Sequence, residues 1–179
     1  LREQKQCEVT GVDIFPLAPG IELDAFAEAD LNKTPLPVDV ADYDYVLMLD
    51  VIEHLNNPER FVEYLREVAS RNTDTCFIVS SGNVSFAVVR MMLLFGQFNY
   101  GKRGILDLTH TRLFTFGALS RLFRQAGFDE TKRVGVPAPF PMASPGAVGN
   151  LLLSLNQLAI KLSKTVFAYQ SYFVFKARP

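Results

Sequence analysis

Residues 43–55 read YDYVLMLDVIEHL, and this stretch decides the fold. Its first seven residues are almost continuously apolar, which is typical of a strand buried on both faces of a sheet. Asp50 follows directly, and Glu53 three residues later completes a pattern close to a capping box, which predicts a helical turn. In open α/β sheets, ligands bind at the carboxyl ends of such strands. Asp50, Val51 and His54 are therefore predicted to stand at a ligand site, although His54 alone is better explained as a surface or capping histidine.

Outward from this stretch, the chain alternates short apolar runs with amphipathic stretches, which indicates an α/β fold. Its 179 residues suit a single domain. The expected strands cover residues 8–14, 25–29, 43–49, 75–81, 131–136 and 170–177. The expected helices are a tail over residues 1–6, a segment that starts at 57–58 and runs past 68, and segments 85–95, 115–126 and 147–167.

Three positions mark helix boundaries. Asn57 is expected to cap a helix in which Pro58 takes the first position, and Thr115 is expected to cap a second helix. Gly127 is expected to end that second helix, because glycine adopts the left-handed conformation that a helix end needs.

Composition removes several function classes. The formal net charge of −1 argues against a broad basic surface, so nucleic acid is not expected as a partner. The two cysteines, Cys7 and Cys76, lie far apart and form no Cys/His cluster, so no metal site is predicted, and a reducing, cytoplasmic setting fits them. Residues 134–160 carry no charge, but prolines and glycines crowd their first half. A spanning helix is therefore not expected, and an interface or substrate-channel segment is favoured.

Two acids follow the first two expected strands. Asp13 ends the strand over residues 8–14, where a carboxylate can accept from both hydroxyls of a ribose. Asp30 follows the next strand, where an acid can accept from an adenine amino group while Leu31 covers the ring. Both acids are also compatible with ordinary turns, because Asp is common there.

A second informative stretch, residues 96–115, reads GQFNYGKRGILDLTHTRLFT. It has little regular periodicity and is rich in His, Arg, Tyr and Asp, a composition that often lines a site. His110 is a candidate general base, because imidazole titrates near neutral pH. The alternative is a structural histidine that bonds to the backbone.

Taken in order, the segments VTGVDI, AEADL, YDYVLMLDVIEHL, FIVSSGN and GILDLTHTRLFT, with a helix ending in QAGF, resemble class I S-adenosylmethionine (SAM)-dependent methyltransferases. The resemblance covers residues 8–128, and the ending YQSYFVFKARP is similar to the last strand of the same fold. The pair DVIEHL and GILDxTHxRxFT is similar to a branch of the family found near or fused to glycosyltransferase modules. That association favours a sugar-linked acceptor.

The resemblance implies a Rossmann-like sheet with helices on both faces, and SAM as the cofactor. It assigns cofactor binding to a pair of residues at each of three strand ends. From ribose to adenine to methionine, these pairs are Asp13 and Ile14, Asp30 and Leu31, and Asp50 and Val51. The resemblance also implies that His54 and His110 face the acceptor pocket and that residues 137–167 cover the substrate side or form an interface.

The sequence departs from the family at two places. The SSxPN-like turn reads Ser80-Ser-Gly-Asn83, with glycine in place of proline. The family's first strand and GxGxG loop, which precede the strand ending at Asp13, have no counterpart in the 179 residues. Three explanations are compatible with this gap: the chain is a fragment of a longer protein, which we favour, the flanking strands pair directly in a contracted sheet, or another chain supplies the strand. The chain is thus expected to be one partial domain.

The sequence therefore predicts a SAM-dependent methyltransferase that acts on a small-molecule or saccharide acceptor, most simply at oxygen. A homodimer is compatible with these features. Two rivals stay open. A nicotinamide-dependent oxidoreductase would use Asp13 equally well, and a non-catalytic methyltransferase-like module would explain the absent glycine loop.

Overall fold

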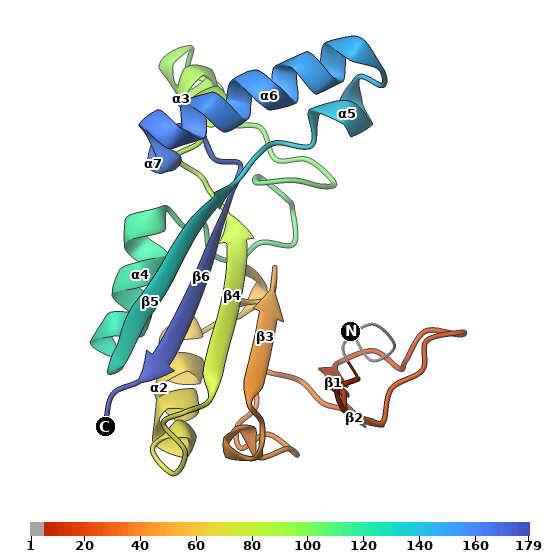
Figure 1. Cartoon of the computed structure of the whole chain (residues 1–179), viewed down its shortest axis with the longest axis vertical. Helices are drawn as coiled ribbons and strands as arrows, with labels where there is room; N and C mark the ends of the chain where they lie inside the picture. Colours follow the sequence, from red (N-terminus) through yellow and green to blue (C-terminus); the bar gives the residue numbers. More distant parts are fainter. Residues whose placement is uncertain (1–5) are drawn as a thin grey trace.

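A computed structural model describes residues 6–179, so the helix tail expected over residues 1–6 lies outside the described residues apart from Gln6, which is in no helix (Figure 1). The strands are β1 Thr10–Asp13, β2 Ala25–Glu28, β3 Tyr45–Leu49, β4 Cys76–Gly82, β5 Phe128–Val136 and β6 Gln170–Ala177. The α-helices are α2 Pro58–Ala69, α3 Ala87–Leu94, α4 Phe116–Gln125, α5 Phe140–Ala143, α6 Ala147–Leu162 and α7 Lys164–Phe167. Two 3-10 turns, η1 Val40–Asp42 and η2 Ile52–His54, flank β3.

The strands form two separate sheets. Four strands pair in the order β3-β4-β6-β5, with β3 parallel to β4 and β6 antiparallel to both neighbours. The parallel pair β1-β2 forms its own sheet to one side (Figure 1). The α/β class is confirmed. The explanation of the missing strand by a contracted sheet is wrong. In the described chain β1 pairs with β2 and β3 pairs with β4, and no hydrogen-bonded pairing joins β1 to β3.

Phenylalanine builds the core between the sheet and helices α2 and α4. Phe123 of α4 stacks on Phe175 of β6 with ring centroids 4.4 Å apart, and Phe175 in turn stacks on Phe173. Phe77 and Phe128 complete this cluster, and both are fully buried. Each buried Phe contributes about 1.5–3 kcal/mol. These contacts fix α2 and α4 on one face of the sheet.

The expectation that residues 43–49 are buried on both faces is wrong. Met48 is buried, but on the other face Tyr45, Leu47 and Leu49 are 61%, 42% and 51% exposed. The reason is tertiary: α2 and α4 cover the face that carries Met48, and within residues 6–179 no strand pairs with the outer edge of β3. An apolar run shows what a strand can bury, and its neighbours decide how much it does bury.

The predicted helix boundaries are largely confirmed. Asn57 Oδ1 accepts from the backbone NH of the third helical residue of α2 at 3.0 Å, and Thr115 Oγ1 caps α4 in the same way at 3.1 Å. Gly127 has φ +96° and ends α4 as expected. The long helix over 147–167 breaks at Ser163, whose extended backbone separates α6 from α7.

The predicted helical turn after β3 is present, but the predicted capping box does not form. Val51 takes the N-cap position of η2 and makes no side-chain cap. Asp50 stands one residue earlier with φ +54°, in the left-handed region that few non-glycine residues adopt.

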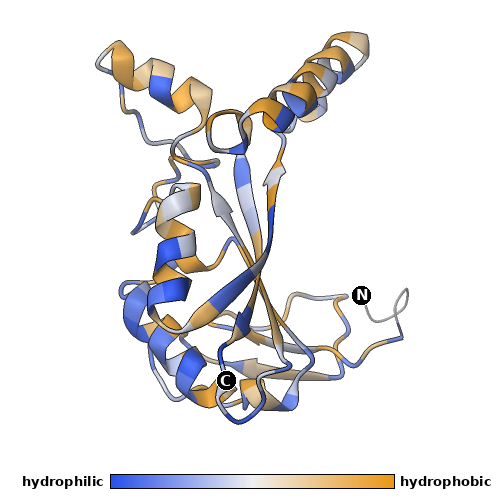
Figure 2. Cartoon of the chain, turned by 60° about the vertical axis from the view of Figure 1, so that its left-hand side comes forward, coloured by the Kyte–Doolittle hydropathy of each residue, from blue (hydrophilic) through white to orange (hydrophobic). Residues whose placement is uncertain are grey.

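Two helical arms stand above the carboxyl ends of β3 and β4: α3 on one side, and α5 to α7 on the other (Figures 1 and 2). Asn83, at the end of β4, donates through Nδ2 to the carbonyls of Thr165 and Ala168 at 2.9 and 2.7 Å. Asn156 of α6 donates to Phe167 O at 2.8 Å and accepts from Ala138 N at 3.0 Å. These two buried asparagines attach the second arm to the sheet.

Candidate functional site

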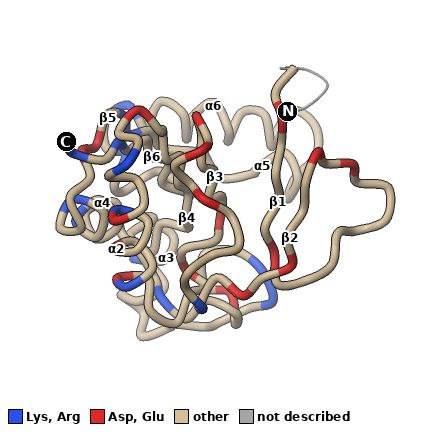
Figure 3. The backbone as a smooth tube through the Cα atoms, turned by 90° about the horizontal axis from the view of Figure 1, so that it is seen from below, with Lys and Arg blue, Asp and Glu red and all other residues tan. Residues whose placement is uncertain are grey.

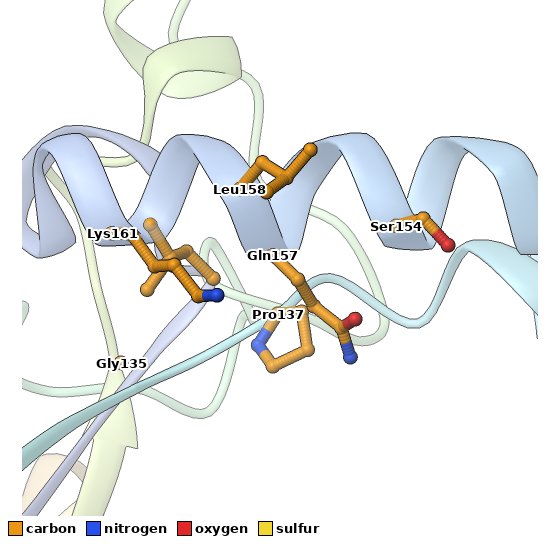
Figure 4. Close-up of a pocket in the computed structure, with 7 residues that line it drawn as sticks. Gly135, Pro137, Ser154, Gln157, Leu158 and Lys161 are labelled. Carbon is orange, nitrogen blue, oxygen red and sulfur yellow. The ribbon is translucent and has the colours of Figure 1, made fainter.

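A hollow of about 310 Å³ lies where β3 and β4 end, beneath the arms. A larger groove of about 600 Å³ runs between α6 and the end of β5, but Lys161 is its one titratable lining residue (Figure 4). The smaller hollow gathers carboxylates, imidazoles, an amide and a phenol, so it is the candidate site. Its lining residues are Asp50, Glu53, His54, Gly82, Arg103, Gly104, Ile105, Asp107, His110, Tyr169 and Gln170.

The two informative stretches of sequence are joined backbone to backbone at this site. Glu53 O accepts from the backbone NH groups of Thr111 and Arg112 at 2.9 and 3.1 Å. Thr111 Oγ1 also donates to Leu55 O at 2.7 Å, and Arg112 forms a two-point ion pair with Glu59 of α2 at 3.1 and 3.2 Å. The turn after β3 and the irregular loop therefore form one unit.

This unit brings the two histidines together, as predicted. Their ring centroids lie 4.8 Å apart at an interplanar angle of 73°. His54 Nδ1 lies 3.1 Å from Thr109 O, and His110 Nδ1 lies 3.0 Å from Ile105 O. A carbonyl only accepts, so each ring donates through Nδ1, and in the neutral imidazole Nε2 is then the acceptor. The structural interpretation of His110 is confirmed by its backbone bond, and its role as a base stays a prediction with which the tautomer fixed by that bond is compatible.

Asp107 shapes the loop that holds His54. Its Oδ1 accepts from the backbone NH and from the hydroxyl of Thr109 at 2.8 and 2.7 Å. These two bonds, the hydroxyl first, lower the pKa of the Asp107 carboxyl. The carboxylate stays charged and keeps Thr109 in position to accept from His54.

Asp50 lies at the carboxyl end of β3, as predicted. The sequence did not indicate its hydrogen-bond partners. Ser80 Oγ donates to its Oδ1 at 3.1 Å, and Gln170 Nε2 donates to both of its carboxylate oxygens at 2.9 and 2.8 Å. Tyr169 lies beside Gln170, and burial, followed by the charge of Asp50, raises the pKa of its phenol. Tyr169 directly precedes β6 and Gln170 opens it, more than 100 residues further along the chain than Asp50, so no local signal marked them.

Glu53 is the least expected member of the site. It is only 2% exposed, and its Oε1 accepts a long bond of 3.4 Å from Gly82 N. Its Oε2 and the neighbouring Ser81 Oγ are buried without a hydrogen-bond partner within residues 6–179. Burial raises the pKa of the Glu53 carboxyl. Its place in DVIEHL is the available signal, and there the sequence pattern predicts a helix cap instead.

The predicted adenine pair lies close to this unit. Asp30 Oδ1 accepts from the backbone and side chain of Asn32 at 3.0 and 3.1 Å, and the backbone bond is the main cause that lowers the pKa of Asp30. Asn32 Oδ1 in turn accepts from Asn56 N at 2.8 Å, just after η2. Leu31 and Val51 both pack against the main core. The loop after β2 is therefore connected to the turn after β3.

The predicted ribose pair is not brought to the hollow. Asp13 ends β1, and its Oδ1 accepts from Phe15 N at 2.9 Å in a local turn. Ile14 is exposed. Neither residue lines the hollow: Asp13 ends a strand of the separate β1-β2 sheet, and Ile14 follows that strand.

Metal binding has no support in the described part of the chain. Among residues 6–179, no three His, Cys, Asp or Glu side chains are grouped so that they could hold a metal ion. Over the same residues, no helix is long and apolar enough to cross a membrane.

Both the sequence and the fold of this chain are similar to those of known proteins. The model of the methyltransferase domain family matches residues 1–132. A SAM-dependent methyltransferase from Archaeoglobus fulgidus is similar in structure, with a TM-score of 0.57 at 16% identity over 99% of this chain and 79% of that one. A putative methyltransferase in complex with the Haloferax volcanii Trm112 methyltransferase activator is similar too, with a TM-score of 0.58 at 16% identity over 99% of this chain and 75% of that one. Comparison with curated proteins finds no match.

The family match and the structural likeness agree with each other. The fold is the Rossmann-like fold of class I methyltransferases, and family and fold together indicate SAM as the cofactor. With a family model that covers most of its length, the chain belongs to the methyltransferase domain family.

Proposed function

We propose that this chain is a SAM-dependent methyltransferase that moves a methyl group to an oxygen of a small-molecule or sugar-linked acceptor. The observation that carries the proposal is the His54–His110 pair, with both Nδ1 atoms bonded to backbone carbonyls and both Nε2 atoms left to accept. The hollow beside the pair holds no cluster of basic side chains, which favours a neutral acceptor over a nucleic acid.

The cofactor's place is supported in part by the residues present. Carboxylates stand at the carboxyl ends of three strands, where Asp13 would hold the ribose, Asp30 the adenine and Asp50 the methionine end. Leu31 and Val51 supply apolar contact beside them. No GxGxG sequence, whose glycines would let the protein backbone approach the cofactor closely, occurs among the 179 residues. Asp50 lines the hollow and Asp30 lies in a loop bonded to the turn after β3, so these two fit polar groups of SAM, whereas Asp13 lies outside the hollow and the glycine loop is not among the 179 residues.

Bound SAM supplies an electrophilic methyl group on a positively charged sulfur. The chain's own residues position the acceptor and take its proton. As the acceptor oxygen takes up that methyl group, His110 Nε2 would accept the proton that the acceptor loses. Because Ile105 O holds Nδ1–H, the imidazole is fixed as the tautomer that can accept at Nε2. His54 borders the same space.

Calorimetric titration of SAM and of its demethylated product into the chain tests the cofactor assignment. We expect binding of both, roughly tenfold weaker in Asp13→Asn and in Asp50→Asn, because each loses an acceptor for a charged or hydroxyl group. Asp74→Asn is the matched control, since that side chain is 98% exposed and lies at the opposite end of β4.

Each rival makes a different prediction in the same titration. Binding of a nicotinamide cofactor without binding of SAM would favour the oxidoreductase and overturn our proposal. Absence of binding by all three ligands would leave the non-catalytic module, and a SAM affinity that Asp74→Asn lowers as much as Asp13→Asn would refute the site assignment.

A further inference from the structure

The two helical arms carry most of the exposed large apolar side chains in the described chain. On α6 they form a stripe at helical spacing, and on α3 and the turn after it they continue to Tyr100. The stripe on α6 consists of Val148, Leu151, Leu152, Leu155, Leu158 and Leu162. On α3 and its following turn the exposed residues are Val88, Met91, Leu93, Leu94, Phe95, Phe98 and Tyr100. Figure 2 shows both arms largely hydrophobic and diverging above the sheet.

Helix α6 has three distinct sides. Gly149, Asn156 and Ile160 face the protein and are buried. A polar side, with Ser154, Gln157 and Lys161, borders the groove beside β5 (Figure 4). The leucine stripe forms the third side of the helix, and packing within residues 6–179 leaves it largely exposed. An exposed apolar stripe of this size marks an interaction surface.

The two arms themselves carry no acidic residue, and the carboxylates nearest to them lie in the hollow beneath. Residues 75–106 and 131–179 contain no Asp or Glu, although the whole chain has a net charge of −1. The negative charge is therefore carried by other parts of the chain. Figure 3 looks at the end of the molecule opposite α6, where acidic and basic residues are interspersed. The basic residues on and between the arms are Arg90, Lys102, Arg103, Lys161 and Lys164.

We propose that α3 and α6 dock on an anionic lipid bilayer, with the leucine stripe in the interface and the basic residues at the headgroups. Apolar side chains flanked by Lys and Arg without acids are the composition of helices that lie in the plane of a membrane surface. A second copy of this chain is disfavoured on the same face, since a symmetric contact would bring two basic, acid-free surfaces together. Lying in the interface requires no spanning helix, in keeping with the helix lengths seen here.

The absence of tryptophan from the sequence allows a specific test. Leu155→Trp places a single reporter on the stripe, and Ile21→Trp is the matched control, because Leu155 and Ile21 are 53% and 54% exposed and Ile21 lies beyond β1, away from the arms. We expect the Leu155→Trp emission to shift to the blue with vesicles of phosphatidylcholine and phosphatidylserine, and the Ile21→Trp emission to stay unchanged. High salt should reverse the shift.

Vesicle sedimentation of the tryptophan-free chain gives the affinity. Leu155→Ser and Leu158→Ser should each weaken binding to phosphatidylserine vesicles roughly tenfold, and Lys161→Glu should weaken it several-fold, whereas Ile21→Ser should not. Sedimentation that is equal with pure phosphatidylcholine vesicles, or absent with both, overturns the proposal. So does light scattering that shows a dimer which Leu158→Ser dissociates, because the partner is then a second copy. None of these readouts depends on methyl transfer.

Discussion

Asn83 offers the sharpest test of how the site is held together. Its amide is fully buried at the end of β4 and donates to Thr165 O and Ala168 O. In Asn83→Ala, Thr165 O keeps the hydroxyl of Ser85 at 2.9 Å, so this loss costs about 1 kcal/mol. Ala168 O, with no other side-chain donor in the described chain, is left buried and unpaired at a cost of about 2 kcal/mol. Asn83 Oδ1 also accepts from Ser85 Oγ and Ser85 N at 2.7 and 3.2 Å, so the expected loss in the free energy of unfolding is at least about 3 kcal/mol.

Urea unfolding followed by circular dichroism measures this loss. With a slope of about 2 kcal/mol per molar urea, the midpoint should fall by about 1.5 M. Asn150→Ala, on the exposed side of α6, is the control and should change stability by less than about 0.5 kcal/mol. A loss below about 1 kcal/mol in Asn83→Ala would refute the reasoning, because the arm would then be held by its apolar contacts rather than by the buried amide.

Two further predictions concern the turn after β3. Glu53 has a folded-state pKa above its ordinary 4.5, so the folded protein binds its proton more tightly than the unfolded chain does, and stability falls as the pH rises from 4.5 toward the raised value. Thermal melts should show the stability of Glu53→Gln, relative to the parent, increasing over that range, and a difference independent of pH would contradict the buried carboxyl. Asp50→Gly and Asp50→Ala remove the same carboxylate, but φ +54° strains only the alanine, so Asp50→Ala should be less stable by about 1 kcal/mol in urea unfolding. Equal stabilities would show that the backbone relaxes in the variants.

Local chemistry explains why much of the fold followed from the sequence. Asn57, Thr115 and Gly127 fulfil their predicted roles because a cap needs only residues within three positions of itself. The family resemblance implied that His54 and His110 face one acceptor pocket, and backbone bonds to Glu53 O show that the segments carrying them meet.

The expectations that were wrong all depended on distant neighbours. Asp50 was predicted to cap a helix, but Ser80 and Gln170, which lie 30 and 120 residues further along the chain, hold its carboxylate instead. The strand over 43–49 was predicted to be buried on both faces, but its second face meets no covering element within residues 6–179.

Sequence alone was enough to predict the succession of strands and helices along the chain, most helix ends and the apolar composition of the core. These features depend on short-range hydrogen bonds and on the periodicity of apolar residues, and both involve residues that are close in sequence. Only the tertiary structure decided that Glu53 is buried, that Tyr169 and Gln170 join the site, and that α6 turns its leucines outward. Burial and proximity depend on which elements pack together, because solvent is excluded by neighbours that lie far apart in sequence.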